Sequence, residues 1–367
     1  MNVNNIGIVG CGKLGICYAI LFAKAGYKVY INDINTIILD NIRNDTYNYT
    51  EDKLNDLIKN YKSNLILSYN INDLLDNCNI IFTYIQTPSL ENGLYNHEYI
   101  NNFVDNCVNY NTIYKTIIIS STVIPEYCDS IVNKLKNNNF NLCYNPSFIA
   151  QGSIINNIIN PDFILLGAGD INIIDNVINI YNKVVVNPND NLYKKMNLLE
   201  AEITKLSINC YITTKITFAN MIGDLSMNKK CNPNTILNAI GSDTRIGHKC
   251  FNYGFGYGGP CLPRDNNALF EYTKNNNFDF SICKLNDENN NTHLMYQFNT
   301  LKHSIEPIVF NYITYKDNSD ILEHSQKLKL AILLANNKNK VIIKERPFII
   351  NILKQTYNDL FEYCDII

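Results

Sequence analysis

Apolar and polar positions along the first half of the chain predict short strands separated by helices. Ile6–Val9 is a short apolar run, residues 13 to about 25 are amphipathic, and Lys28–Ile31 has a second strand pattern. Further short runs predict strands at Asn79–Tyr84, Thr116–Ser121, Asn141–Tyr144, Phe163–Leu166 and Val184–Val186. Because strands alternate with helical or polar segments, we expect an α/β fold with a Rossmann-type, doubly wound parallel sheet.

The pattern changes near residue 198. Leu198–Met227 contains no proline and predicts one long helix. A second α/β pattern follows, with strands at Ile308–Thr314 and Lys340–Ile343 and helices at about Ser325–Asn336 and Ile349–Tyr363. We therefore expect three domains: a nucleotide-binding domain at 1–195, a helical central domain at 196–295 and a small α/β domain at 296–367.

Composition and charge exclude several classes of protein. The chain has 367 residues, is 46% hydrophobic and carries a formal net charge of −3. It offers no basic stripe for nucleic acid, no polybasic membrane patch and no apolar run of the roughly 18 residues that a spanning helix needs. With no signal-peptide pattern at the N-terminus, we expect a cytoplasmic protein. The 12 cysteines form no CxxC pair, so we expect no metal site and mostly buried thiols.

The first turn has the spacing of a phosphate-binding loop. A G-x-G-x-x-G motif joins the first predicted strand to the first helix, and the second strand leads to Asp33. The glycines allow a tight turn and close approach of a pyrophosphate to the helix N-terminus, while the acidic residue accepts ribose hydroxyls and repels a 2′-phosphate. NAD is therefore the predicted cofactor, and its predicted contacts here are Gly10, Gly12, Lys13, Leu14, Gly15 and Asp33.

A second glycine-rich segment, residues 255–265, contains a cysteine that a ligand could approach. Cys261 follows two glycines and a proline, and Asp265 lies four residues further on. An attacking cysteine must be partly thiolate, which requires cationic or hydrogen-bonding help, and Lys205 and Arg264 are the candidates for that help. Lys205 and Asn209 are four residues apart, so they share one face of the long helix. We interpret Cys261 as a nucleophile and the other cysteines as buried structural residues.

Further short motifs occur in order between about residues 5 and 270. They are Thr87-Pro88, Ser121–Pro125, Asn145–Gly152, Asn160–Asp162, Ala201–Lys205 with Asn209, and Asp243–Gly247. With these motifs and the Cys261 loop, the chain resembles the UDP-glucose/GDP-mannose dehydrogenase family, and most closely its UDP-glucose 6-dehydrogenase branch. The resemblance implies a homodimer formed through the central helical domain, and a C-terminal domain that binds the nucleotide.

The resemblance also implies a four-electron oxidation of UDP-glucose to UDP-glucuronate. The C6 hydroxyl would give a hydride to NAD, Cys261 would capture the aldehyde as a thiohemiacetal, and a second hydride transfer would leave a thioester for hydrolysis. Lys205 and Asn209 would stabilise oxyanionic character at C6. Asp265 and Thr122 would orient water for proton transfer.

The remaining site residues are also implied by the resemblance. Thr87, Thr122 and Arg264 would contact the cofactor. The nucleotide sugar would contact Phe148, Ile149, Lys205, Asn209, Arg245, Phe255, Gly258 and Lys316, with Arg245 coming from the neighbouring subunit.

Several features depart from the family pattern, among them Pro260, where the family often has Ser or Tyr, and Arg264, where it usually has Lys. Ser147 and Gln151 stand where the family has glutamates, and the second of these is usually assigned to thioester hydrolysis. A glutamine can bind a water molecule but cannot accept its proton, so Asp265 takes over that step, or turnover is slow, or the substrate differs. Glu323 replaces an arginine on the uridine side, and we expect the C-terminal domain to be too short for the family's complete nucleotide-binding lobe.

Two classes of function therefore compete. The first is an active dehydrogenase for UDP-glucose, with GDP-mannose or a UDP-N-acetylhexosamine as alternative substrates. The second is a degenerate family member that binds NAD or a nucleotide sugar without completing turnover, which Gln151 and Glu323 favour. The intact catalytic set favours the enzyme: Cys261, Lys205, Asn209 and Asp265.

Overall fold

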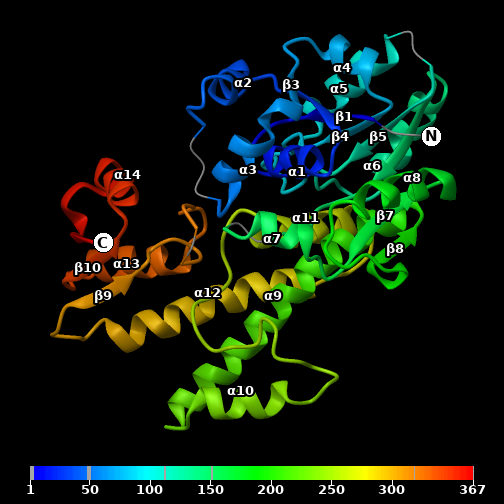
Figure 1. Cartoon of the computed structure of the whole chain (residues 1–367). Coiled ribbons are helices and arrows are strands. Elements are labelled where there is room, and N and C mark those ends of the chain that lie inside the picture. The colour runs from blue at the N-terminus through cyan, green and yellow to red at the C-terminus, as the bar shows by residue number, and fades with distance from the viewer. Residues whose placement is uncertain (1–3, 48–50, 111–112, 150–151, 318, 367) are drawn as a thin grey trace. The chain divides into compact units, whose positions relative to one another are not determined.

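The computed structural model describes residues 4–47, 51–110, 113–149, 152–317 and 319–366. The chain forms two compact units, Met1–Lys205 and Leu206–Ile367 (Figure 1). The boundary falls within the long helix α9, Leu198–Asn228, which the sequence predicts to within one residue. The finer division at residues 195 and 295 stays a prediction.

The first unit contains an eight-stranded sheet in the order β3-β2-β1-β4-β5-β6-β7-β8. Its strands are β1 (Asn5–Val9), β2 (Lys28–Asn32), β3 (Leu65–Leu67), β4 (Ile80–Thr83), β5 (Lys115–Ile119), β6 (Phe140–Tyr144), β7 (Ile164–Ala168) and β8 (Tyr193–Met196). All neighbours pair in parallel except β6 and β7, which are antiparallel. The predicted doubly wound α/β sheet is confirmed, and the switch point beside β1 is where such sheets bind ligands.

Helices cover both faces of this sheet, which explains its almost continuous apolar strands. Every residue of β5 is buried, with Ile118 in one core cluster and Ile117 and Ile119 in the other. Successive side chains of a strand point to opposite faces, so both faces are covered. The helices of the unit are α1 (Lys13–Lys24), α2 (Thr36–Arg43), α3 (Leu54–Tyr61), α4 (Ile71–Asn77), α5 (Glu98–Val108), α6 (Tyr127–Lys136), α7 (Ile154–Ile159) and α8 (Ile171–Tyr181).

The strand predicted at Val184–Val186 is wrong. These residues form a turn after α8, in which the backbone N–H groups of Val184 and Val185 donate to the carbonyl oxygen of Tyr181. Val185 is buried in the core, so its apolar character serves packing rather than strand pairing. The last strand is instead β8, whose Lys194 and Lys195 are exposed at the sheet edge, where charged side chains are tolerated.

The second unit begins with the remainder of α9 and adds three helices, α10 (Pro233–Gly241), α11 (Leu262–Asn275) and α12 (Ile282–Leu301). A parallel three-stranded sheet in the order β11-β10-β9 follows. It is built from β9 (Ile308–Asn311), β10 (Val341–Glu345) and β11 (Glu362–Asp365), with α13 (Gln326–Asn336) and α14 (Pro347–Tyr357). The small C-terminal α/β region is thus confirmed.

The predicted helix Ile349–Tyr363 is too long. Asn358 has a φ of 48° directly after α14, which ends the helix. The chain then pairs with β10, and Tyr363 lies opposite Ile343 in that ladder. Across the described ranges of the chain, no helix is long and apolar enough to cross a membrane.

Candidate active site

The first glycine-rich turn is shaped as a nucleotide-binding loop requires. Gly10 has a φ of +89°, and a Cβ there would lie 2.7 Å from the carbonyl oxygen of Tyr84. A Cβ at Gly15 would collide with the carbonyl oxygen of Gly10. By contrast, the space beside Gly12 is open to 4 Å, and α1 begins at the next residue, Lys13, followed by Leu14. A phosphate can therefore reach the backbone N–H groups at the start of α1.

Asp33 joins this loop to the end of β2. Its Oδ2 accepts the backbone N–H of Cys11 at 2.6 Å, and its Oδ1 accepts that of Asn35 at 2.8 Å. A carboxylate has about four acceptor positions, so each oxygen keeps capacity for a ribose hydroxyl. The open approach at Gly12 and the oriented carboxylate of Asp33 fit NAD.

The loops that follow β4 and β5 are tied together. The Thr87 hydroxyl donates to the carbonyl oxygen of Thr122 at 2.8 Å, and the Ser121 hydroxyl donates to that of Ile85 at 2.5 Å. Thr87 is buried and Thr122 is half-buried. The two predicted threonines therefore lie together beyond the carboxyl ends of adjacent strands, the position where α/β sheets bind ligands.

Lys205 lies against the segment that contains Ser147 and Phe148. Its Nζ donates to the carbonyl oxygen of Ser147 at 2.9 Å and lies 4.5 Å from the ring centre of Phe148. Phe148 and Ile149 are half-buried, whereas Lys205 is 6% exposed. A buried ammonium held by a carbonyl and an aromatic face is suited to stabilise developing negative charge. Gln151 lies outside the described residues.

In the second unit, Cys261 is the residue immediately before α11, and its side chain is exposed. The N-terminus of a helix of this length favours negative charge on the sulfur. One turn further, Asp265 is 1% exposed. Its Oδ2 accepts from the Asn209 amide at 2.6 Å, and its Oδ1 accepts from Arg264 Nε at 3.3 Å. The structure thus joins three predicted residues, Asp265, Asn209 and Arg264, directly beside the Cys261 turn.

The predicted sugar-nucleotide contacts of this unit divide into two groups. Phe255 lines a pocket of about 520 Å³, together with Met227, Tyr253, Tyr296, Gln297, Thr300, Leu301, Ile308, Val309, Phe310, Asn311, Lys327 and Leu330. Gly258 packs so closely that a Cβ would collide with the carbonyl oxygen of His324. Lys316 is exposed, and Arg245, whose side chain is 87% exposed, pairs with Asp243. Gly258, Lys316 and Arg245 are not among the residues that line the pocket.

The cysteines follow the prediction only in part. Eight are buried, and burial raises the pKa of Cys107 and Cys143 to about 12, which makes them inert thiols. Three others are exposed like Cys261, so the expectation that they are buried is wrong: Cys231, Cys250 and Cys364. Exposure alone does not distinguish Cys261; its place before α11 and its neighbour Asp265 do.

Several buried polar residues that support the site escape sequence analysis. Glu202 is fully buried in α9, and its carboxylate accepts the backbone N–H groups of Glu126 and Cys128, both at 2.7 Å, at the start of α6. It therefore caps a helix more than 70 residues away. In the second unit, Asn290 and His293 of α12 hold the backbone of residues 254–257. No local signal marks such long-range contacts.

The sequence matches a known family over most of its length. Residues 4–185 match the NAD binding domain of the UDP-glucose/GDP-mannose dehydrogenase family, and residues 199–292 match its central domain. The chain belongs to this family. The expected family, the dehydrogenase class and NAD as cofactor are thereby confirmed.

Known relatives agree with this assignment. The UDP-glucose 6-dehydrogenase of Rickettsia felis is 27% identical over 342 residues, which cover 90% of this chain and 76% of that protein. The enzyme of Rickettsia conorii is 28% identical over 76% of this chain and 65% of its own length. Thus the chain spans about two thirds to three quarters of these two relatives.

Solved structures show the same fold. A UDP-glucose dehydrogenase from Pyrobaculum islandicum has a TM-score of 0.89 at 22% identity, covering 100% of this chain and 87% of that one. The UDP-D-ManNAc dehydrogenase from Pyrococcus horikoshii has a TM-score of 0.80 at 22% identity, covering 93% and 83%.

Proposed function

We propose that this protein is a nucleotide-sugar dehydrogenase that oxidises UDP-glucose to UDP-glucuronate through an intermediate bound to Cys261. The observation that carries the proposal is the exposed Cys261 thiol before α11, one turn from the buried Asp265 carboxylate. A protein that only binds nucleotides has no need for a thiol poised in this way, so the geometry favours the enzyme over the degenerate binder.

The reaction needs two hydride transfers and one covalent capture. NAD, when bound, supplies the hydride acceptor for each oxidation. After the first oxidation, the Cys261 sulfur adds to the C6 aldehyde and gives a thiohemiacetal, which can lose a second hydride and become a thioester. Water then adds to the thioester carbonyl, the C–S bond breaks and the thiolate is regenerated with the carboxylate product.

The chain's own residues have distinct roles in this proposal. Lys205 and Asn209 stabilise negative charge on the C6 oxygen. Asp265, which already orients the Asn209 amide, accepts the proton of the attacking water because Gln151 cannot. Thr122 helps to orient that water, and Arg264 supports the Asp265 carboxylate.

The aromatic pocket of the second unit is our candidate for the nucleotide base. Tyr253, Phe255, Tyr296 and Phe310 line it, and aromatic faces of this kind stack on bases. We further propose that the protein is a homodimer and that the exposed Arg245 serves the partner's substrate.

Other nucleotide sugars are the second candidates. Solved structures with this fold include a UDP-D-ManNAc dehydrogenase and a GDP-mannose dehydrogenase from Pseudomonas aeruginosa, whose TM-score is 0.61 at 20% identity, covering 98% of this chain and 87% of that one. Ser147 and Glu323 also depart from the family pattern near the predicted sugar and uridine contacts. GDP-mannose and UDP-N-acetylhexosamines therefore belong in the substrate panel.

The test is to count NADH released per sugar with purified protein, NAD and each nucleotide sugar, while intact-mass spectrometry detects covalent adducts. We expect two NADH per UDP-glucose and no lasting adduct. The Cys261→Ser variant should lose net oxidation and keep NAD binding, whereas Cys250→Ser, at another exposed cysteine, should behave as wild type. Normal turnover by Cys261→Ser would contradict the covalent mechanism.

Other outcomes separate the alternatives. A burst of NADH that stops with an adduct on Cys261 would mean that Asp265 does not replace the missing glutamate. Two NADH from a different sugar would reassign the substrate. No NADH and no adduct with any of these sugars would favour the binding protein.

A further inference from the structure

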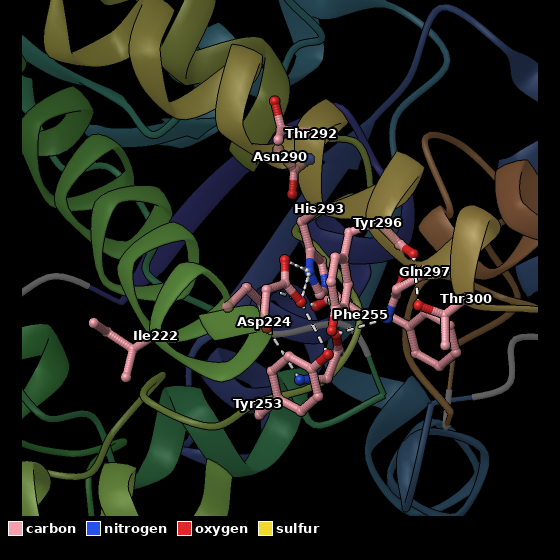
Figure 2. A network of polar contacts seen from close by, with 12 residues as sticks. Ile222, Asp224, Tyr253, Phe255, Asn290, Thr292, His293, Tyr296, Gln297 and Thr300 are labelled. Carbon is pink, nitrogen blue, oxygen red and sulfur yellow. Dashed lines mark hydrogen bonds and ion pairs between the residues drawn. The ribbon is translucent and has the colours of Figure 1, made fainter. Parts of the chain in front are cut away.

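A buried histidine and a half-buried aspartate lie beside the aromatic pocket and take no part in the proposed chemistry. His293 of α12 is 2% exposed, and its Nδ1 lies 2.8 Å and 3.0 Å from the two carboxylate oxygens of Asp224 in α9. Its Nε2 lies 2.7 Å from the carbonyl oxygen of Gly254. Figure 2 shows the side chains of Asp224, Tyr253 and His293 converging in this network.

Both ring nitrogens of His293 therefore face acceptors. A carbonyl oxygen only accepts hydrogen bonds, and so does an ionised carboxylate, whereas a neutral imidazole has a single N–H to donate. Only the doubly protonated ring donates to Asp224 and Gly254 together. The hydroxyl of Tyr253 also donates to Asp224 at 2.9 Å, which suits an ionised carboxylate. The titratable groups around the His293 ring are Asp224 of α9, Tyr253 of the loop before α11 and Tyr296 of α12.

These contacts fix Gly254, the residue directly before the glycine-rich segment 255–265, from several sides. The Gly254 carbonyl oxygen accepts from His293 and, at 3.1 Å, from the Gln297 amide, while the Gly254 N–H donates to the side-chain oxygen of Asn220 at 3.0 Å. A charge-assisted bond from an imidazolium is roughly twice as strong as a neutral one. The loop is therefore anchored to both α9 and α12 at Gly254.

Anchoring Gly254 also fixes two walls of the pocket. Its neighbours in sequence, Tyr253 and Phe255, both line the cavity. The Tyr253 ring packs so closely on α9 that a Cβ at Gly223 would collide with it, and its hydroxyl bonds to Asp224. The orientation of both aromatic side chains thus depends on the same network.

We propose that His293 and Asp224 form a positioning pair, an imidazolium and a carboxylate that fix Tyr253 and Phe255 as walls of the nucleotide pocket. The role of the pocket rests on the proposed function. The pair acts on ligand binding and not on the reacting atoms, so its loss should raise the KM for the nucleotide sugar and leave kcat nearly unchanged.

The protonation of His293 can be measured without any ligand. The chain has five histidines, so imidazole 15N resonances of the labelled full chain can be assigned to His293 by their loss in His293→Gln. At neutral pH we expect both nitrogens to show the chemical shift of a protonated nitrogen. One unprotonated nitrogen would overturn the inferred imidazolium.

The positioning role is tested by UDP titration and steady-state kinetics. We expect His293→Gln to weaken UDP binding and raise the KM for the nucleotide sugar about tenfold, because one charge-assisted bond is lost, with the KM for NAD unchanged. His303→Gln, the same change at an exposed histidine, is the control. Asp224→Asn keeps the shape of the pair and should give a smaller effect in the same direction, which covers the case in which His293→Gln fails to fold.

The outcomes distinguish this inference from the proposed function. Equal UDP affinity and KM in wild type, His293→Gln and Asp224→Asn would overturn the positioning role, and so would a loss of kcat at constant KM. Failure of the wild type to bind UDP, or any other nucleotide of the substrate panel, would overturn the proposed role of the pocket and the pair's role with it. The 15N measurement would still decide the charge of His293.

Discussion

Residues 10–15 and 254–259 are both rich in glycine, but different atoms surround them. At the first loop, the atoms that exclude a side chain are backbone carbonyls: that of Tyr84 at Gly10 and that of Gly10 at Gly15. At the second loop, they are mainly contributed by distant elements, such as the Asn290 side chain of α12 at Gly256. Thus the first loop is determined by its own strand–turn–helix unit and the adjacent strand end, whereas the second depends on residues far along the chain.

The two loops also differ in their polar support. The first is held by one carboxylate, Asp33, which lies 22 residues from its partner Cys11 and belongs to the same local unit. The second is held by a clamp in which Asn290 accepts from the Tyr257 N–H and donates to the Tyr257 carbonyl oxygen, each at 3.0 Å, together with the His293 pair. Substitution of these supporting side chains should therefore destabilise the second loop only partly. By contrast, a side chain that blocks the close backbone contacts of the first loop should prevent that loop from forming.

The largest effect is expected from Gly15→Ala. Its Cβ would meet the Gly10 carbonyl oxygen, which cannot move without opening the turn, so we expect a loss of about 3 kcal/mol or more in unfolding free energy and no NAD binding. Chemical denaturation and NAD titration measure both. Gly12→Ala is the matched control: it has open space and should keep its stability while weakening NAD binding. Equal stability of the two variants would contradict the backbone explanation.

Asp33→Ala should affect ligand affinity next most strongly. It removes the acceptor proposed for the ribose and the partner of the Cys11 and Asn35 N–H groups, so NAD binding should weaken by on the order of 1–3 kcal/mol. Isothermal titration calorimetry measures the change. Asp33→Asn keeps one acceptor oxygen and should lose less. If NAD affinity stayed constant in Asp33→Ala, the ribose would have to bind elsewhere.

Gly256→Ala examines the second loop in the same way. The new Cβ would meet Asn290 Oδ1, a side-chain atom, so Asn290 must shift and release part of its clamp, at a cost of about 2 kcal/mol. If this explanation holds, the double variant Gly256→Ala/Asn290→Ala will be more stable than the sum of the two single changes predicts, because the collision is removed. Strict additivity in urea denaturation would show that the clamp is not the cause.

This contrast explains how much of the molecule the sequence predicts. The first loop could be located from its motif because glycine spacing, helix start and Asp33 all lie within one βαβ unit. Cys261, Asp265 and Asn209 could be named from a family resemblance, yet the bond between Asn209 and Asp265 spans 56 residues and needs the structure. Glu202 and His293 could not be found, because an acidic residue or histidine within a helix most often faces solvent, and burial is a property of the folded chain. The strand prediction at Val184–Val186 was wrong for the same reason, because apolar residues pack in turns as well as in strands.

The smallest effect concerns His97, a half-buried histidine beside the Thr122 loop. His97 Nε2 accepts the backbone N–H of Ile124 at 3.4 Å, and its ring stacks on Tyr127 at 4.1 Å. Burial lowers the pKa of His97 from 6.5 to about 4, so the folded protein keeps this ring neutral. The unfolded chain then takes up a proton at higher pH than the folded one, and stability falls as the pH drops from 6.5 towards 4.

At about pH 5.5 this loss amounts to about 1 kcal/mol relative to neutral pH. His97→Phe keeps the aromatic stack and removes the titration, so its unfolding free energy should fall less between neutral pH and about pH 5.5 than that of the wild type. His303→Phe, at an exposed position, should retain the wild-type slope. Identical acid slopes in all three proteins would show that the fold does not hold His97 as a neutral acceptor. His97 and His293 therefore support their loops in different ways: His97 accepts a backbone N–H, whereas both ring nitrogens of His293 face acceptors.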